Sequence, residues 1–520
     1  MTENFESYGV PNGYAKAPTF IPPNKCQLRK LAENLGLELS EEELTAYRER
    51  MLGLDEDYSV LDELAEPTLP VNYPRTPGWR PKADDNPFNG WYWRTDIQGA
   101  PSGKLAGKTL GIKDNTAVAG VPMMNGSRVL EGYMPEFDAT VVTRILDAGG
   151  RILGKTASED LCLGGSSFTN SKMPVLNPYD PTRSAGGTSA GSAALVAGGQ
   201  IDMALGGDQG GSIRMPASWC GIVGLKPTWG LVPYTGASAM HPHLDHMGPM
   251  TRTVEDCALL LEVTAGYDNG LDPRQPQNLV VPEYAKLLSA DLTDMNVGLV
   301  KEGFFKCEEQ VTSTIRASMQ YFQAAGAKVQ EISIPLHITG RKLVSPILLE
   351  GCYENIFNGA GSAFGFPGFY PTSMQEAQAR GLRTHFNDVS HTVKVNALIG
   401  EYTKQRYNHI HYAKAMNCAR LLRQAYDDAL ANYDVIVMPT IHILPAKLLE
   451  KKASIIESIE RSLEMIHNTP QFNVTHHPAL SINAGFADGL PVGLMIVGKH
   501  FDEATLLKAA YGFQQNRDGH

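Results

Sequence analysis

The sequence lacks a long apolar run, an excess of basic residues and a secretory leader. No uninterrupted apolar stretch approaches the roughly 20 residues that a membrane span requires, so we expect no membrane partner. The net charge of −11 argues against a nucleic-acid partner, because nucleic acid binds basic stripes. The opening MTENFESYGVPNG has neither the basic start nor the apolar run of a signal peptide. We therefore expect a cytoplasmic protein.

Cysteines are few, and they follow no regular spacing. The seven cysteines are odd in number, scattered and never spaced as CxxC, which excludes the usual disulfide and zinc frameworks. We interpret them as small buried thiols in a reducing compartment. Hydrophobic residues make up 42% and charged residues 19% of the 520 residues, a balance typical of a globular protein.

The first 90 residues differ in texture from the rest. Ser40 and Glu43 have the form of a capping box at the start of a helical run. Six prolines between Pro67 and Pro87 then exclude a helix or a central strand. We predict a helical arm and a proline-rich linker over 1–90, followed by a core over 91–515.

From residue 91 onward, short apolar runs alternate with amphipathic stripes. The stripes at 137–150 and 501–515 predict helices, and Asp488-Gly489 predicts a hairpin turn. The apolar runs predict strands at 108–114, 151–156, 201–207, 295–300, 327–334, 433–440, 480–486 and 490–498. This alternation predicts an α/β fold, a large mixed β-sheet core flanked by helices. Residues roughly 345–432 are predicted to form a helical insertion.

Glycine is abundant, and the most informative glycines lie in the segment 184–224. The chain holds 51 glycines, more than the roughly 7% of an average protein. The glycine-rich turn at Gln209, Gly210 and Gly211 could direct successive N–H groups to one point, as an oxyanion hole requires. Ser212 follows directly and would be placed to attack a carbonyl whose oxygen sits there.

Three other interpretations of this segment compete. The glycines could serve packing alone, with a solvated serine beside them. A phosphate loop would need GxxxxGK[ST] or a GxGxxG after a strand, and neither is present. The residues Gly187-Thr188-Ser189-Ala190-Gly191 satisfy the G-x-S-x-G of a nucleophile elbow. That motif needs a strand directly before it, and the preceding NPYDPTRSAG is typical of irregular chain.

The segment 184–228 resembles the amidase signature, and Gly-Ile-Lys113-Asp-Asn resembles the lysine segment of that family. Further matches run through Glu159-Asp-Leu, Leu225-Lys-Pro-Thr and the closing LPVGLMIVG, so that the resemblance covers roughly 91–515. GGDQGGSIR, GLVPYTG and YDVIVMPT are similar to nitrile-hydratase-associated amidases and to urethanases, which hydrolyse carbamates.

The resemblance implies a Ser–cis-Ser–Lys triad. It places the nucleophile at Ser212, the base at Lys113 and the middle residue at Thr188, where the family's GGSSGG turn reads GGTSAG. Threonine keeps the hydroxyl, but its methyl stiffens the side chain in a turn expected to carry a cis peptide. The relay could therefore be Thr188 or Ser189. A lysine acts as a base only when neutral, and burial disfavours its charged form.

The resemblance also implies the surroundings of the nucleophile. It implies an oxyanion hole at Gln209, Gly210 and Gly211, and an acyl pocket that Leu163 and Leu244 line. It gives Asp208 and Arg214, which flank Ser212, a structural or substrate-orienting role. The predicted catalytic residues are therefore Lys113, Thr188, Ser189 and Ser212. The predicted substrate-binding residues are Leu163, Leu244 and Asp208.

The expected function is hydrolysis of small neutral amides, and of carbamates such as ethyl carbamate, through an acyl-enzyme. No cofactor and no metal are expected, and His241, His243 and His246 are interpreted as loop histidines. Two alternatives stay open. One is a glutamine amidotransferase-type subunit, which would have a stable protein partner. The other is a catalytically impaired binding protein, for which the threonine in the turn is the only support. The arm favours a homodimer.

Overall fold

The computed structural model describes residues 20–362, 364–450 and 452–519, and the opening segment considered above for a leader lies outside them. The chain divides into two compact units, Met1–Thr68 and Leu69–His520. In the smaller unit, helices form at α1 (Lys25–Asn34), α2 (Glu41–Leu52) and α3 (Asp55–Glu63). The predicted capping box is confirmed: Ser40 accepts from Glu43 N at 3.2 Å, and Glu43 accepts from Ser40 N at 2.8 Å.

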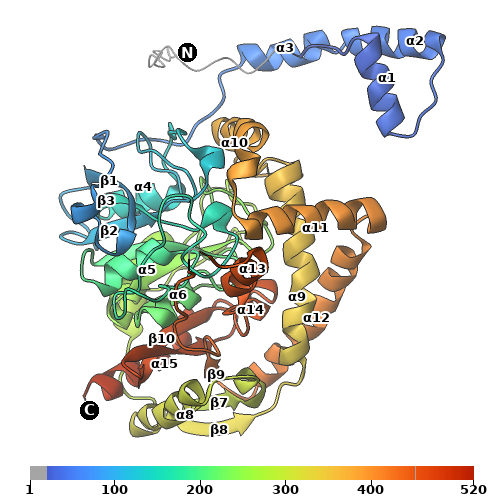
Figure 1. The fold of residues 1–520 in the computed structure, drawn as a ribbon. Helices are drawn as coiled ribbons and strands as arrows, with labels where there is room; N and C mark the ends of the chain where they lie inside the picture. Colours follow the sequence, from blue (N-terminus) through green and yellow to red (C-terminus); the bar gives the residue numbers. More distant parts are fainter. Residues whose placement is uncertain (1–19, 363, 451, 520) are drawn as a thin grey trace. The chain divides into compact units, whose positions relative to one another are not determined.

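An 11-stranded mixed sheet forms the larger unit, in the order β1-β3-β2-β4-β6-β5-β10-β11-β9-β7-β8 (Figure 1). The strands are β1 (Trp91–Gln98), β2 (Thr109–Lys113), β3 (Arg151–Thr156), β4 (Met203–Asp208), β5 (Val223–Lys226), β6 (His246–Thr251), β7 (Asn296–Val300), β8 (Lys328–Ile332), β9 (Val435–Pro439), β10 (Ala479–Ala487) and β11 (Leu490–Val497). β2 pairs in parallel with both β3 and β4. The carboxyl ends of these three strands therefore lie at the same edge of the sheet.

Helices cover both faces of this sheet, as the fold class predicts. The helices of the larger unit are α4 (Thr140–Asp147), α5 (Ala190–Ala197), α6 (Arg214–Trp219), α7 (Val254–Thr264), α8 (Glu309–Ala324), α9 (Leu336–Cys352), α10 (Thr372–His385), α11 (His391–Tyr407), α12 (Ile410–Leu430), α13 (Ile455–Leu463), α14 (Gln471–Val474) and α15 (Glu503–Asp518). Among the described residues, no helix is long and apolar enough to cross a membrane.

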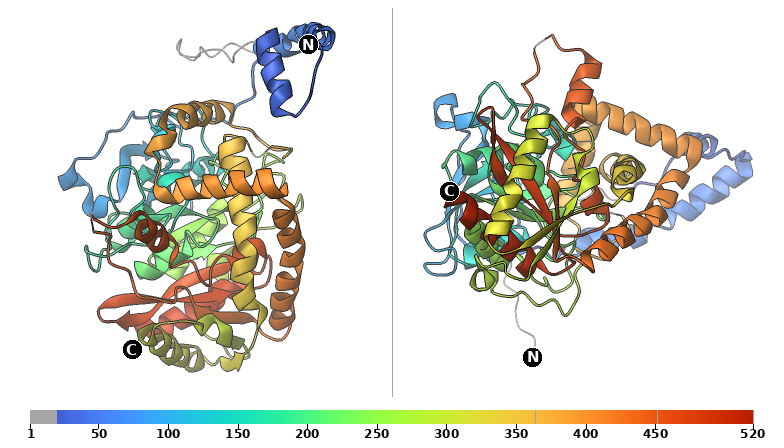
Figure 2. Two further views of the ribbon diagram at one scale, coloured as in Figure 1. Left: turned by 45° about the vertical axis from the view of Figure 1, so that its right-hand side comes forward. Right: turned by 90° about the horizontal axis from the view of Figure 1, so that it is seen from below.

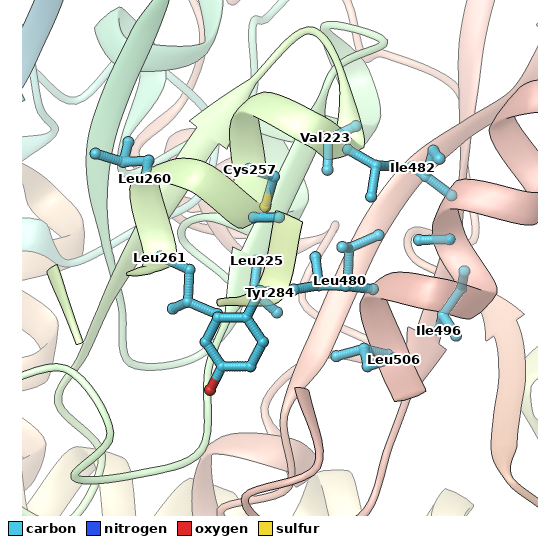
Figure 3. Packing of buried hydrophobic residues seen from close by; sticks show 14 of the residues in the cluster. Val223, Leu225, Cys257, Leu260, Leu261, Tyr284, Leu480, Ile482, Ile496 and Leu506 are labelled. Atoms are coloured by element: carbon cyan, nitrogen blue, oxygen red, sulfur yellow. The ribbon is translucent and has the colours of Figure 1, made fainter. Parts of the chain in front are cut away.

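Alternate residues of each strand feed two apolar layers. Met203 and Leu205 of β4 join the core formed with α4, α7, α8 and α15, whereas Ala204 between them joins the layer of α5 and α6. Figure 3 shows the first layer, with residues of β5, β10 and β11 packed against α7 and α15. This two-sided burial explains why the strands have continuous apolar runs in the sequence.

The region predicted as a helical insertion, roughly 345–432, contains α10, α11, α12 and the end of α9. α9 and α12 pack side by side, and α11 contacts α9 (Figures 1 and 2). Asn408 and His409, both at positive φ, turn the chain sharply between α11 and α12. α11 also contacts α13. The helices α9, α11 and α13 therefore form one continuous wall.

Candidate active site

Lys113 is the last residue of β2, and its side chain is completely buried. Its Nζ lies 2.7 Å from Thr188 Oγ1 and donates to Gly207 O at 3.2 Å. The adjacent Asp114 pairs instead with Lys155 at 3.5 Å, and burial raises the pKa of Asp114 to about 6 against the opposing Lys155 charge. In the described part of the chain, no carboxylate forms an ion pair with Lys113.

Thr188 lies in a tight turn that precedes α5. The Gly187–Thr188 peptide bond is cis, and the carbonyl of Thr188 accepts from Glu159 N at 3.3 Å. A Cβ on Gly187 would lie 2.2 Å from Glu159 Oε2, so only glycine fits there. Burial raises the pKa of Glu159, whose oxygens accept from Ser166 and Thr169. The carboxyl group thus packs directly against the turn that carries Thr188.

Ser189 is bound to the backbone of β4. Its Oγ donates to Gly207 O at 3.1 Å and accepts from Gly207 N at 3.2 Å, and its N–H donates to Ser212 O at 3.2 Å. The residues before Gly187 form no strand, so the turn lacks the strand that a nucleophile elbow requires. The side chain of Ser189 therefore ties the turn to the strand, and its backbone ties the turn to Ser212.

Asp208 does not line the cavity beside Ser212, so of the two predicted roles its contacts fit the structural one and not substrate binding. It forms a completely buried, bidentate ion pair with Arg214, with N–O distances of 3.0 Å. It also accepts from the N–H groups of Gly211 at 2.7 Å and Ile213 at 3.1 Å. Burial alone would raise the pKa of Asp208, but the Arg214 charge and its hydrogen bonds hold that pKa below its usual range. Because both oxygens are occupied, Asp208 shapes the loop around Ser212.

Two further residues hold the same loop from a distant part of the chain. Asn473 of α14 donates to Asp208 Oδ1 at 2.8 Å, and Thr469 Oγ1 donates to Gly210 O at 2.6 Å. Arg214 in turn donates to Thr469 O at 2.9 Å. No motif in the sequence marks Asn473 or Thr469, since they lie more than 250 positions after the loop.

The predicted oxyanion hole is only partly available. The Gly211 N–H already donates to the Asp208 carboxylate, so this donor is turned toward the ion pair. Within the described chain, the N–H groups of Gln209 and Gly210 make no hydrogen bond. These two N–H groups remain as candidates for binding a carbonyl oxygen beside Ser212.

A cavity of about 300 Å³ opens beside Ser212. Its apolar lining comes mainly from the cavity wall, which we define as α9, α11, α13 and the segment 464–470; the wall residues are Val344, Leu348, Leu349, Val395, Ile399, Ile459, Leu463, Ile466 and Pro470. Cys162, Leu163, Gln209 and Gly210 complete the side near the nucleophile. Among the described residues that line the cavity, Arg341 is the only charged one, and it is solvent-exposed.

The two leucines predicted for the acyl pocket have different positions. Leu163 lines the cavity, as expected. Leu244 does not, and that prediction is wrong: it is completely buried and packs with Val344 and Ile347 of α9. Leu244 therefore supports the cavity wall from behind.

Comparison with known proteins identifies the family. The family model described as Amidase matches residues 92–507, which is most of the chain. The chain belongs to the amidase signature family. An enantioselective amidase of Rhodococcus rhodochrous is 42% identical over 499 residues, covering 95% of each chain. One of the subunits of the glutamyl-tRNA(Gln) amidotransferase of Methanosarcina acetivorans is 37% identical, covering 82% of this chain and 88% of the relative.

The solved structures agree with this family assignment. The peptide amidase of Stenotrophomonas maltophilia superposes with a TM-score of 0.65 at 27% identity, covering 80% of this chain and 84% of that one. This member of the amidase signature family is therefore an enzyme that hydrolyses carbon–nitrogen bonds. The amidase match spans the strands and turns that hold Lys113, Thr188 and Ser212, and it also includes the cavity wall.

Proposed function

We propose that the protein is an amidase in which Ser212 forms an acyl-enzyme and Lys113 acts as the base through Thr188. One observation carries this proposal: Lys113 Nζ and Thr188 Oγ1 lie 2.7 Å apart, both fully buried, in the turn that is hydrogen-bonded to Ser212.

The proposed proton path starts from the Lys113–Thr188 hydrogen bond and extends it to Ser212. Thr188 donates its hydroxyl proton to the neutral amine of Lys113 and accepts the proton of Ser212 Oγ as that atom attacks the amide carbonyl. The tetrahedral intermediate collapses when the proton returns along the same path to the leaving nitrogen, which departs as an amine or ammonia. Water then attacks the acyl-enzyme by the reverse route and releases the acid. Ser189, whose hydroxyl is bound to Gly207, keeps the turn in place and takes no proton.

The oxyanion would be stabilised by the N–H groups of Gln209 and Gly210. Each of these donors should matter, since removing a single oxyanion donor costs about 10²–10³ in rate. The Asp208–Arg214 pair keeps the loop in this conformation through its hydrogen bonds to Gly211 and Ile213. The pair is thus a positioning element and not a substrate contact.

The cavity supports a neutral acyl group as the substrate. Its lining is largely apolar, and the described lining residues include no aspartate or glutamate. A zwitterion such as free glutamine would leave its ammonium group without a partner there, which is costly. Aliphatic and aryl amides fit this lining. Carbamate esters, which are suggested by the sequence resemblance to urethanases, present the same carbonyl geometry.

A substrate panel tests the proposal. Acetamide, benzamide, racemic 2-phenylpropanamide, ethyl carbamate and glutamine would be compared by ammonia release, with Ser212→Ala as the blank. We expect benzamide or 2-phenylpropanamide to give the highest kcat/KM. One enantiomer should react preferentially, as the name of the Rhodococcus rhodochrous relative suggests. Hydrolysis of none of the five at a rate above the blank would contradict the proposal.

The amidotransferase alternative rests on a specific finding, the 37% identity to one of the subunits of a glutamyl-tRNA(Gln) amidotransferase. Glutamine as the best substrate, together with inactivity of the isolated chain, would favour it. An active homodimer in size-exclusion chromatography with multi-angle scattering would favour the amidase. The absence of a carboxylate from the described cavity lining is the reason for preferring the amidase.

A further inference from the structure

A second cluster of reactive side chains lies outside the proposed catalytic site. It consists of Asp427 on α12, His477 just before β10 and His500 just after β11. One ligand atom from each residue lies within 4.8 Å of the others. His477 Nε2 lies 2.9 Å from Asp427 Oδ1, and His500 Nδ1 lies 3.7 Å from the same oxygen. The two imidazole rings are 4.0 Å apart, centroid to centroid.

Thr475 orients both rings. Its carbonyl oxygen lies 2.9 Å from His500 Nε2, and its hydroxyl lies 3.0 Å from His477 Nδ1. Because a carbonyl can only accept, His500 Nε2 must carry the proton, and the lone pair of the neutral ring is then on Nδ1. That lone pair faces Asp427 Oδ1. Two hydrogen-bond acceptors, His500 Nδ1 and Asp427 Oδ1, therefore face each other with no proton between them.

Burial, and then the charge of His477, lowers the pKa of His500 to about 4. Burial also lowers the pKa of His477, although Asp427 opposes the effect. Both shifts favour the neutral imidazole, which is the form that binds a metal ion. An oxygen bonded to the far nitrogen of each ring, as Thr475 provides here, is the usual arrangement around metal-bound histidines.

We propose that Asp427, His477 and His500 bind a divalent transition-metal ion, with zinc as the expected occupant. Two imidazoles and one carboxylate supply three protein ligands, and water completes a tetrahedron. Asp427 is 39% exposed, which leaves a path for the ion and its water. Two cations oppose binding: Arg423, 3.6 Å from the other oxygen of Asp427, and the buried Lys226, whose charge acts on His477.

The ion would fasten α12 of the insertion to the ends of β10 and β11. The chain just before His477 also contacts the loop around Ser212. Thr469 donates to Gly210 O, and Asn473 donates to Asp208. Metal binding at this site is independent of the proposed chemistry at Ser212, and it would act on the enzyme through stability. Its measurement therefore needs no substrate.

Cobalt titration of the untagged protein tests the site. We expect one equivalent of Co²⁺ to produce the intense visible absorption of a tetrahedral complex, and Zn²⁺ to displace it. His500→Ala should weaken Co²⁺ binding at least tenfold, and Zn²⁺ should raise the melting temperature of the wild type but not of this variant. Thr475→Val, which removes only the hydroxyl beside His477, should weaken binding about 10–100-fold. His411→Ala is the matched control, because this exposed histidine of α12 is outside the cluster.

Two results would overturn the proposal. One is the absence of a stoichiometric tetrahedral cobalt spectrum in the folded wild type. The other is equal affinity in the wild type and in His500→Ala. If His500→Ala does not fold, Asp427→Asn serves instead, since this side chain is partly exposed and its replacement removes only the charge. Unchanged cobalt affinity in that variant would count equally against the site.

Discussion

The residues around Ser212 and the cavity wall are held in place by different interactions. Around Ser212, buried polar groups bond to one another in pairs: Lys113 to Thr188, Ser189 to Gly207, Asp208 to Arg214. The cavity wall is held by apolar side chains packed between helices. A buried hydrogen bond fails when either partner is lost, whereas an apolar wall tolerates changes that keep its volume. The first region should thus control rate and the second should control substrate choice.

Loss of the nucleophile is the largest expected effect. Ser212→Ala removes the atom that forms the acyl-enzyme, and hydrolysis should fall on the order of 10⁶-fold. A fluorophosphonate probe should label Ser212 in the wild type, with mass spectrometry identifying the site. Circular dichroism and the melting temperature should stay unchanged. Labelling of Ser189 with Ser212 untouched would show that the nucleophile is misassigned.

Loss of the base comes next. Lys113→Arg keeps a cation of similar length, but a guanidinium stays protonated and cannot accept a proton. Activity should fall nearly as far as in Lys113→Met, measured as kcat/KM over ordinary pH. Lys108→Arg, at a partly exposed ion pair with Asp256 on the same stretch of chain, is the control and should be active. An active Lys113→Arg enzyme would be incompatible with a neutral-lysine mechanism.

The relay should have a smaller effect that depends on one hydroxyl. Thr188→Val keeps the shape and removes the group bonded to Lys113, so kcat should fall by about 10²–10⁴. Thr188→Ser should retain activity. Ser189→Ala should act more mildly, because its hydroxyl bonds the Gly207 backbone. The reverse ranking, with Ser189→Ala inactive and Thr188→Val active, would assign the relay to Ser189.

The smallest effect, and the most selective, should come from the cavity wall. Val395→Phe narrows the cavity from α11. It should lower kcat/KM for 2-phenylpropanamide by about 10–200-fold relative to acetamide. Leu398→Phe on the same helix is the control, because Leu398 is 70% exposed and does not line the cavity. Equal losses for the large and the small amide would show that the wall does not select the acyl group.

The sequence predicted the two regions unequally, for a physical reason. Lys113 and Ser212 lie in local motifs, and the strands that carry them have continuous apolar runs. The predicted hairpin at Asp488-Gly489 is also confirmed, with both residues at positive φ between β10 and β11. β6 was not predicted, because its six residues contain Gly248 and Pro249, and only pairing with β4 and β5 makes it a strand.

The errors concern two residues whose side chains are occupied by other parts of the protein. Leu244 and Asp208 have the residue types that a pocket would use, but α9 covers the first and Arg214 occupies the second. The contact of Leu244 with α9 joins segments far apart in the sequence, which no local spacing encodes, whereas Arg214 lies only six positions after Asp208. The wall residues have no motif, since an apolar face on a helix has the same pattern whether it meets a core or a cavity.

The close packing of Gly187 against Glu159 has a consequence for directed evolution. Because a side chain at Gly187 would collide with the Glu159 carboxyl group, saturation mutagenesis of Gly187 should yield few survivors. A library confined to α9 and α11 should keep most clones folded while it varies the space beside Ser212. New substrate ranges are thus most accessible by diversifying the two helices, with Gly187 kept invariant.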